Sequence, residues 1–156
     1  MKKLLKKNWA VAGLLAIFSL SLFSFISPAG GEGFEIYLNN KLVLQKFGND
    51  MDKVQTISLD ESSLNGELSV KYHHCGRVGK NRVLTIKDAD NKTLKEWKFG
   101  DVSQPSASMK CGVKEIYSLK LKNNAKLHLY YASSELPKGR MLATINASAS
   151  PKSTQP

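Results

Sequence analysis

Histidine, cysteine and methionine residues gather in two short segments of this chain, and these are the side chains best suited to chemistry. His73, His74 and Cys75 are consecutive, and Met109 and Cys111 lie together further along. Imidazole, thiolate and thioether groups are the ligands that copper(I) and zinc prefer. A copper or zinc site built from these five residues is therefore one hypothesis, although none of their spacings matches a known zinc motif.

The two cysteines support a competing interpretation. An even number of cysteines in an exported protein favours a disulfide, and an oxidised pair cannot bind a metal as thiolates. Strand alternation would also place His73 and His74 on opposite faces of one strand, which separates two of the proposed ligands. We therefore expect a disulfide between Cys75 and Cys111, beside histidines that hold no metal.

Two tyrosines are candidates for binding a ligand by their rings. Tyr37 and Tyr130 fall at positions that alternation directs outward, whereas Tyr72 and Tyr131 point into the predicted core. Aromatic rings on the surface of a sheet can stack on sugar rings. Tyr37 and Tyr130 are therefore the predicted ligand-binding residues of this sequence.

Motifs of catalysis are not found in the sequence. It contains no Gly-x-Ser-x-Gly elbow, no phosphate-binding loop and no His-Glu-x-x-His pair. The acidic residues are few, and most of them lie beside lysines or in turns. We expect a protein that is not an enzyme and that uses no cofactor.

The first 29 residues have the layout of a secretory signal peptide. Four lysines precede an uncharged stretch, Trp9 to Ile26, and Ser27 and Ala29 supply small residues for cleavage after Ala29. Eighteen uncharged residues also reach the lower limit for a membrane-spanning helix, so an uncleaved anchor is the alternative. Either reading places the rest of the chain outside, as a periplasmic or secreted protein or as a domain anchored to the inner membrane.

The charge of the chain favours an anionic partner. It has 23 basic and 13 acidic residues, a formal net charge of +10, and four of the lysines belong to the leader. The remaining excess suits an unknown protein or an anionic component of the cell envelope. No block of five like charges occurs, so we expect no nucleic acid as partner and no membrane contact except through an uncleaved leader.

Short runs of alternating apolar residues, separated by Asn, Gly and Asp, dominate the chain after the leader. They predict about eight strands in an antiparallel β-sandwich, immunoglobulin-like in the broad sense of strand number and patterning. This fold would occupy residues 30–146, with a disordered tail at 147–156. The predicted strands cover residues 34–38, 41–47, 54–59, 67–73, 82–87, 93–99, 113–121, 126–131 and 141–145.

The inward positions of these runs define the predicted core. The expected buried residues are Leu68, Val70, Leu84, Ile86, Trp97, Leu119, Leu127 and Leu129. The chain would be an exported, non-enzymatic sandwich that binds a component of the envelope or a secreted partner. The alternative is a periplasmic metal-binding or redox protein that uses the histidine, cysteine and methionine set.

Overall fold

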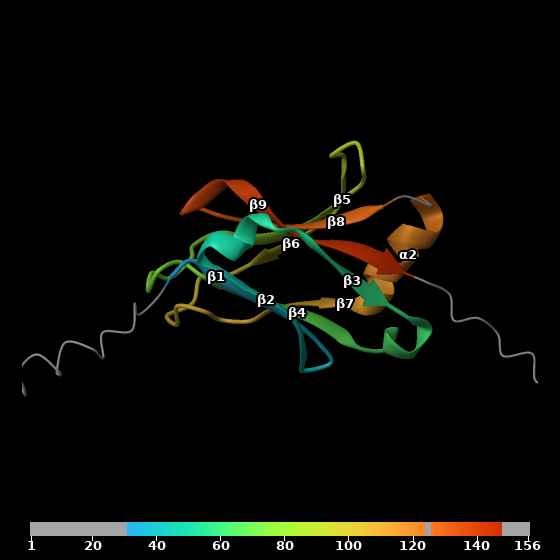
Figure 1. Cartoon of the computed structure of the whole chain (residues 1–156), viewed down its shortest axis with the longest axis horizontal. Helices are drawn as coiled ribbons and strands as arrows, with labels where there is room; N and C mark the ends of the chain where they lie inside the picture. The colour runs from blue at the N-terminus through green and yellow to red at the C-terminus, as the bar shows by residue number, and fades with distance from the viewer. Residues whose placement is uncertain (1–30, 124–125, 148–156) are drawn as a thin grey trace, which may run out of the picture.

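The computed structural model describes residues 31–123 and 126–147 (Figure 1). Within these ranges the chain forms nine β-strands, one α-helix and two short 3-10 helices. The prediction of a mainly β protein is therefore confirmed in this coarse form. The predicted leader and residues 148–156 of the predicted tail lie outside the described residues. Among the described residues, no helix has the length and apolar composition that crossing a bilayer requires.

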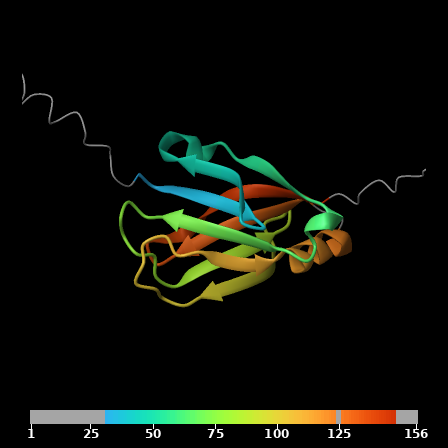
Figure 2. The same ribbon diagram turned by 90° about the horizontal axis from the view of Figure 1, so that it is seen from below.

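The strands form two sheets, of four and five strands. The four-stranded sheet has the order β2-β1-β4-β7, visible in Figure 2, and all its pairs are antiparallel. The five-stranded sheet has the order β3-β9-β8-β5-β6, in which only β3 and β9 run parallel. The first sheet comprises β1 (Gly33–Leu38), β2 (Lys41–Phe47), β4 (Glu67–His73) and β7 (Met109–Gly112). The second comprises β3 (Gln55–Leu59), β5 (Arg82–Lys87), β6 (Thr93–Phe99), β8 (Leu127–Ser133) and β9 (Leu136–Ala147).

Two predicted turns form where Asn and Asp residues interrupt the alternation. Asn39 and Asn40 both have positive φ angles, 52° and 64°, as a two-residue hairpin turn between twisted strands requires. In the β5–β6 turn, the Asp88 carboxylate accepts hydrogen bonds from the backbone N–H groups of Asp90 and Lys92, at 3.0 and 2.9 Å. Asn and Asp are favoured here because they tolerate left-handed backbone or bond to it locally.

One core lies between the two sheets. Six of the eight predicted core residues are buried there: Leu68, Val70, Leu84, Ile86, Leu127 and Leu129. Burying each such side chain contributes about 1.5–3 kcal/mol. Trp97 and Leu119 are only partly buried and pack against the edge of this core. They are less enclosed than predicted because β6 is an edge strand and Leu119 belongs to a helix.

The segment predicted as a strand at 113–121 is a helix, α2 (Val113–Asn123). Val113, Ile116 and Tyr117 are buried, so the apolar spacing is three and four residues and not two. Their β-branched and aromatic side chains gave the segment a misleading resemblance to a strand. Figure 1 shows that α2 covers one end of the two sheets, opposite the end where the described chain begins.

The last strand is longer than predicted. The β8–β9 turn lies at 134–135, because Ser133 pairs with Leu136, and not at residues 137–139. Gly139 instead has a φ of +69° beside a register shift within the β8–β9 pair. β9 ends at Ala147, one residue beyond the predicted boundary of the folded region. The two 3-10 helices are η2 (Gly48–Asp52) and η3 (Glu61–Ser63).

Candidate functional site

The His73–Cys75 segment lies at the end of β4, where the chain turns back. Arg77 donates its backbone N–H to the carbonyl of His74 at 3.0 Å, and Cys75 and Gly76 between them have φ angles of 52° and 82°. The Cys75 side chain is exposed at the tip of this turn. As predicted by alternation, His73 lies on the outer side of the sheet, against Phe47, whereas His74 turns inward.

His74 is buried in a polar cluster that joins the two sheets. Its Nε2 atom is 2.8 Å from the hydroxyl of Tyr131 and 3.4 Å from that of Ser133. The Tyr72 ring stacks on the Tyr131 ring with centroids 4.2 Å apart. Burial lowers the pKa of His74 and raises the pKa of Tyr131, so both side chains stay neutral near pH 7.

A cleft of about 420 Å³ opens above this cluster and is called the His74 cleft. Its lining residues are Glu32, His74, Cys75, Arg77, Glu135 and Leu136. Glu32 accepts a hydrogen bond from the Tyr72 hydroxyl at 2.5 Å and lies 3.5 Å from the Arg140 guanidinium. Glu135 accepts the backbone N–H of Lys80 at 2.9 Å. Glu32, His74 and Glu135 are therefore each engaged with a residue outside the cleft lining.

The structure does not gather the proposed metal ligands. Met109 pairs with Val70 in the β4–β7 ladder, and Cys111 pairs with Leu68, so both lie along β4 and away from the His74 turn. Nowhere in residues 31–123 and 126–147 do three His, Cys, Asp or Glu residues form a group that could hold a metal ion. The alternative hypothesis of a metal centre therefore has no geometric support.

The predicted disulfide is not seen in this structure, in which both cysteines are free thiols. β4 and β7 are antiparallel, which places Cys111 beside Leu68 at the start of β4, while Cys75 follows the end of β4. Seven residues of extended chain separate these points by roughly 20 Å. Both cysteines lie near strand ends, but at opposite ends of β4.

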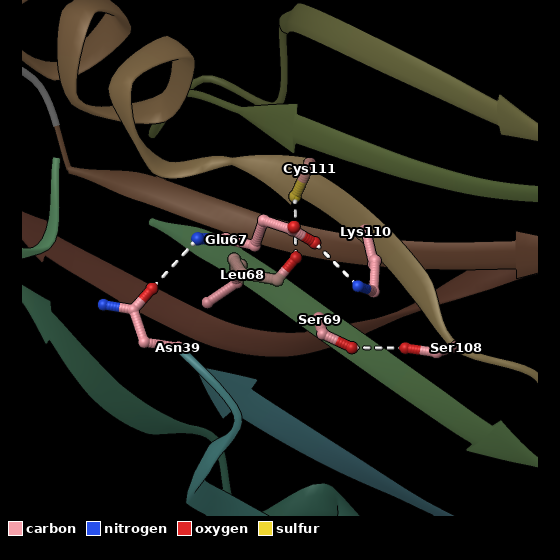
Figure 3. Close-up of polar contacts among 7 residues, drawn as sticks. All are labelled: Asn39, Glu67, Leu68, Ser69, Ser108, Lys110 and Cys111. Atoms are coloured by element: carbon pink, nitrogen blue, oxygen red, sulfur yellow. Dashed lines mark hydrogen bonds and ion pairs between the residues drawn. The ribbon is translucent and has the colours of Figure 1, made fainter. Parts of the chain in front are cut away.

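Cys111 is a buried thiol without a chemical role among its neighbours. Its Sγ atom donates to the carbonyl oxygen of Leu68 at 3.6 Å, as Figure 3 shows. Burial raises the pKa of Cys111 to about 12. Such a thiol is neutral near pH 7 and is not a nucleophile.

A second cleft, of about 240 Å³, lies on the outer side of the four-stranded sheet and is called the Tyr37 cleft. It is lined by Tyr37, Asn40, Ser69, Lys71, Ser108 and Lys110. Ser69 and Ser108 share a hydrogen bond, and Lys110 forms an ion pair with Glu67 at 3.0 Å; both contacts are drawn in Figure 3. Strand alternation explains the position of Tyr37, Ser69 and Lys71, which all point outward.

Tyr37 has polar neighbours on two sides. Its hydroxyl donates to Glu35 at 2.5 Å, and this hydrogen bond raises the pKa of Tyr37. The Lys71 ammonium lies 5.0 Å from the centre of the ring, within the range of a cation–π contact. The predicted candidate Tyr37 therefore belongs to a cleft with several hydrogen-bonding groups.

Tyr130 lies on the five-stranded sheet in a similar local arrangement. Lys87 places its ammonium 4.5 Å from the centre of the ring, and the Tyr130 hydroxyl donates to Asn91 at 3.3 Å. Tyr37 and Tyr130 are thus two half-buried tyrosines, each beneath a lysine. Of the two, Tyr37 lines the Tyr37 cleft.

Sequence reasoning missed most of the residues that accompany these two sites. The His74 cluster also includes Glu32, just before β1, and Arg140 and Glu135 of the β8–β9 hairpin. Nothing in their local sequence indicates these contacts. Ser108 and Lys110 reach the Tyr37 cleft because β7 pairs with β4. The inward alternation of Tyr72 and Tyr131 was a usable signal for the tyrosine stack.

The fold and the two clefts define a mainly β protein with one polar cluster between its sheets and one open cleft on a sheet surface. No protein-family model matches the chain, and no curated protein sequence matches it.

Proposed function

We propose that the protein is an exported, non-catalytic β-sandwich, immunoglobulin-like in the broad sense, that binds an anionic polysaccharide of the cell envelope. The observation that carries this proposal is the lining of the Tyr37 cleft. It combines the ring and hydroxyl of Tyr37 with two ammonium groups, two serine hydroxyls and one side-chain amide. The lining residues include no carboxylate, and the two nearest ones are engaged, Glu35 with Tyr37 and Glu67 with Lys110. An aromatic ring suits the apolar face of a sugar, and the polar groups suit its hydroxyls and carboxylate.

The two lysines of the Tyr37 cleft differ in their availability. Lys110 pairs with Glu67, whereas Lys71 forms no ion pair within the described part of the chain and rests over the Tyr37 ring. An ammonium group in this position can donate charge-assisted hydrogen bonds to a sugar carboxylate. Lys71 and Tyr37 are therefore the two residues on which binding should depend most.

The His74 cleft is the larger of the two but is less suited to a ligand. His74 already bonds Tyr131, and Glu32 already bonds Tyr72 and contacts Arg140. A ligand would have to replace these contacts, and replacing a hydrogen bond gains little net free energy. We assign this cluster to holding the two sheets together.

The assignment to the cell exterior rests on the sequence. The basic leader with its uncharged stretch is typical of an export signal, and a basic excess remains when its four lysines are set aside. Acidic polysaccharides are common outside cells and attract such a surface through long-range electrostatics.

Isothermal titration of the full chain with polygalacturonate, which carries one carboxylate per sugar, tests the proposal against dextran, which is neutral. We expect binding of polygalacturonate that weakens with salt and little binding of dextran. Lys71→Ala and Tyr37→Ala should each weaken binding at least about tenfold, which corresponds to ~1.4 kcal/mol.

Lys87→Ala and Tyr130→Ala are matched controls, because they remove the same pair of side chains from the other sheet. They should bind polygalacturonate as the wild type does. The proposal is wrong if polygalacturonate does not bind, if dextran binds equally well, or if the control variants lose as much affinity as the Tyr37 cleft variants.

A further inference from the structure

Exposed apolar side chains are concentrated along one lateral edge of the two sheets. Leu42, Val43 and Phe47 of β2 and Val54, just before β3, are each at least 40% exposed. β2 is an edge strand of the four-stranded sheet and β3 an edge strand of the five-stranded sheet, and η2 connects them (Figure 2). Single exposed apolar residues are ordinary, but exposed apolar residues on an unpaired edge strand offer a place where another chain can pair.

A groove of about 150 Å³ runs between these two edge strands and is called the β2–β3 groove. Its apolar lining comes from Leu38, Val43, Ile57, Leu59 and Leu68, and hence from both sheets. Val43 is an extra residue in β2, because Ile36 pairs with Leu44 while Tyr37 pairs with Leu42. A bulge of this kind redirects a side chain, here toward the groove.

β6 and β2 are both edge strands that carry charged side chains. β6 carries Lys95, Glu96 and Lys98, with Lys95 paired to Glu115 and Lys98 paired to Glu96. β2 carries Lys41 and Lys46 and the bulge at Val43. Charged side chains and bulges along an edge strand hinder indiscriminate pairing with other chains, so β2 should accept only a segment whose charges complement its lysines.

The charges of β2 indicate the kind of partner. Lys41 and Lys46 form no ion pair among the residues that the structure describes. Two nearby acids are engaged elsewhere, Asp50 with Lys53 and Asp52 with Arg140. A second copy would bring the same lysines to the contact, together with a basic excess of +6 once the four leader lysines are set aside from the formal +10, and this opposes self-association.

We propose that the β2 edge binds an extended segment of an acidic protein by strand addition. The segment would pair its backbone with β2, place an apolar side chain in the β2–β3 groove, and set carboxylates near Lys41 and Lys46. Strand addition gains affinity from main-chain hydrogen bonds and specificity from pockets for alternate side chains. This surface is distinct from the Tyr37 cleft and does not depend on its function.

Two synthetic peptides test the proposal with the full, isotope-labelled chain. In the first, valine alternates with glutamate and threonine; in the second, lysine replaces glutamate. The first peptide should shift the backbone amide signals of β2 and β3, and the second should bind at least tenfold more weakly. Val43→Lys should weaken binding of the first peptide at least tenfold.

Val102→Lys is the matched control, because it makes the same change at an exposed valine in another part of the surface. It should bind the first peptide normally. Val54→Lys, at a more exposed position, provides a second test should Val43→Lys fail to fold. The proposal is overturned if neither peptide binds, if both bind equally, or if the Val43 and Val54 variants bind normally. Sedimentation that shows a dimer broken by Val54→Lys would assign the edge to a second copy instead.

Discussion

The Nε2 atom of His74 lies 2.8 Å from the hydroxyl oxygen of Tyr131, and this contact joins the end of β4 to the middle of β8. It is a buried hydrogen bond between the two sheets. Gly79 covers it so closely that a Cβ atom at this position would lie 2.8 Å from the Tyr131 hydroxyl and 2.9 Å from His74 Nε2. The cluster thus depends on a glycine as well as on its ring pair.

Acid should destabilise the protein through His74. Burial holds the pKa of His74 below its usual value of 6.5, so the unfolded chain takes up a proton more readily than the folded one. The stabilising contribution is complete above pH 6.5 and declines as the pH falls through 6.5 toward the folded-state pKa. Urea unfolding at pH 7.5 and 5.5 should show a loss of stability that is smaller in His74→Gln.

The charged groups that face His74 set the control for this experiment. Glu32 and Glu135 raise its pKa and His73 lowers it, but burial dominates. His73→Gln removes the neighbouring imidazole from the outer side of the sheet and should keep the acid sensitivity of the wild type. Equal losses in the wild type and in His74→Gln would contradict the assignment to His74.

Cys75 should be the reactive thiol of the native protein. It is exposed, whereas Cys111 is buried with its pKa raised to about 12. A thiol reagent should therefore modify one thiol per native chain and two after unfolding, and Cys75→Ser should abolish the native reaction. Reductant should leave the melting temperature unchanged. Absence of free thiols in the unfolded wild type would show that the disulfide forms after all.

A substitution at Cys75 should stabilise the turn that follows β4. Cys75 has a φ of 52°, a left-handed conformation that is unfavourable for most residues but tolerated by asparagine. Cys75→Asn should raise the free energy of unfolding by about 0.5–1 kcal/mol, because asparagine tolerates this φ. Unlike glycine, asparagine does not also increase the conformational entropy of the unfolded chain. Cys75→Ala keeps the unfavourable Cβ and should give no gain in the same denaturation experiment. A destabilised asparagine variant would argue against strain at this position.

Arg82 should control the order of the loop between β6 and β7. Its guanidinium is buried and donates to the carbonyl oxygens of Gly100 and Ala107, both at 2.9 Å. Arg82→Met should lower stability by about 1–3 kcal/mol, because both carbonyls lose a charged donor, and a protease should cut the loop faster. Arg77→Met, at an exposed arginine, should change neither measurement. Unaltered proteolysis in Arg82→Met would show that other contacts hold the loop.

The local signals of the sequence were sufficient for most strands but not for the sites. Period-two alternation identified β4, β5 and β8 and their buried leucines, because each has one face on the core. Alternation failed for α2, where Val113, Ile116 and Tyr117 fit a short strand as well as a helix. No local pattern reveals which strands become neighbours. The cysteine pairing failed for this reason, because it required knowing which end of β4 meets β7.

The parallel pairing of β3 with β9 has a consequence for how the protein folds. β3 lies in the first half of the chain, but its ladder partners, Ala143 to Ala147, follow it by 88 residues. The β1–β2 hairpin can close through local contacts, whereas β3 pairs only when β9 is brought to it across this long separation, which slows folding. A chain truncated before β9 would keep that strand permanently open, and such edges promote aggregation.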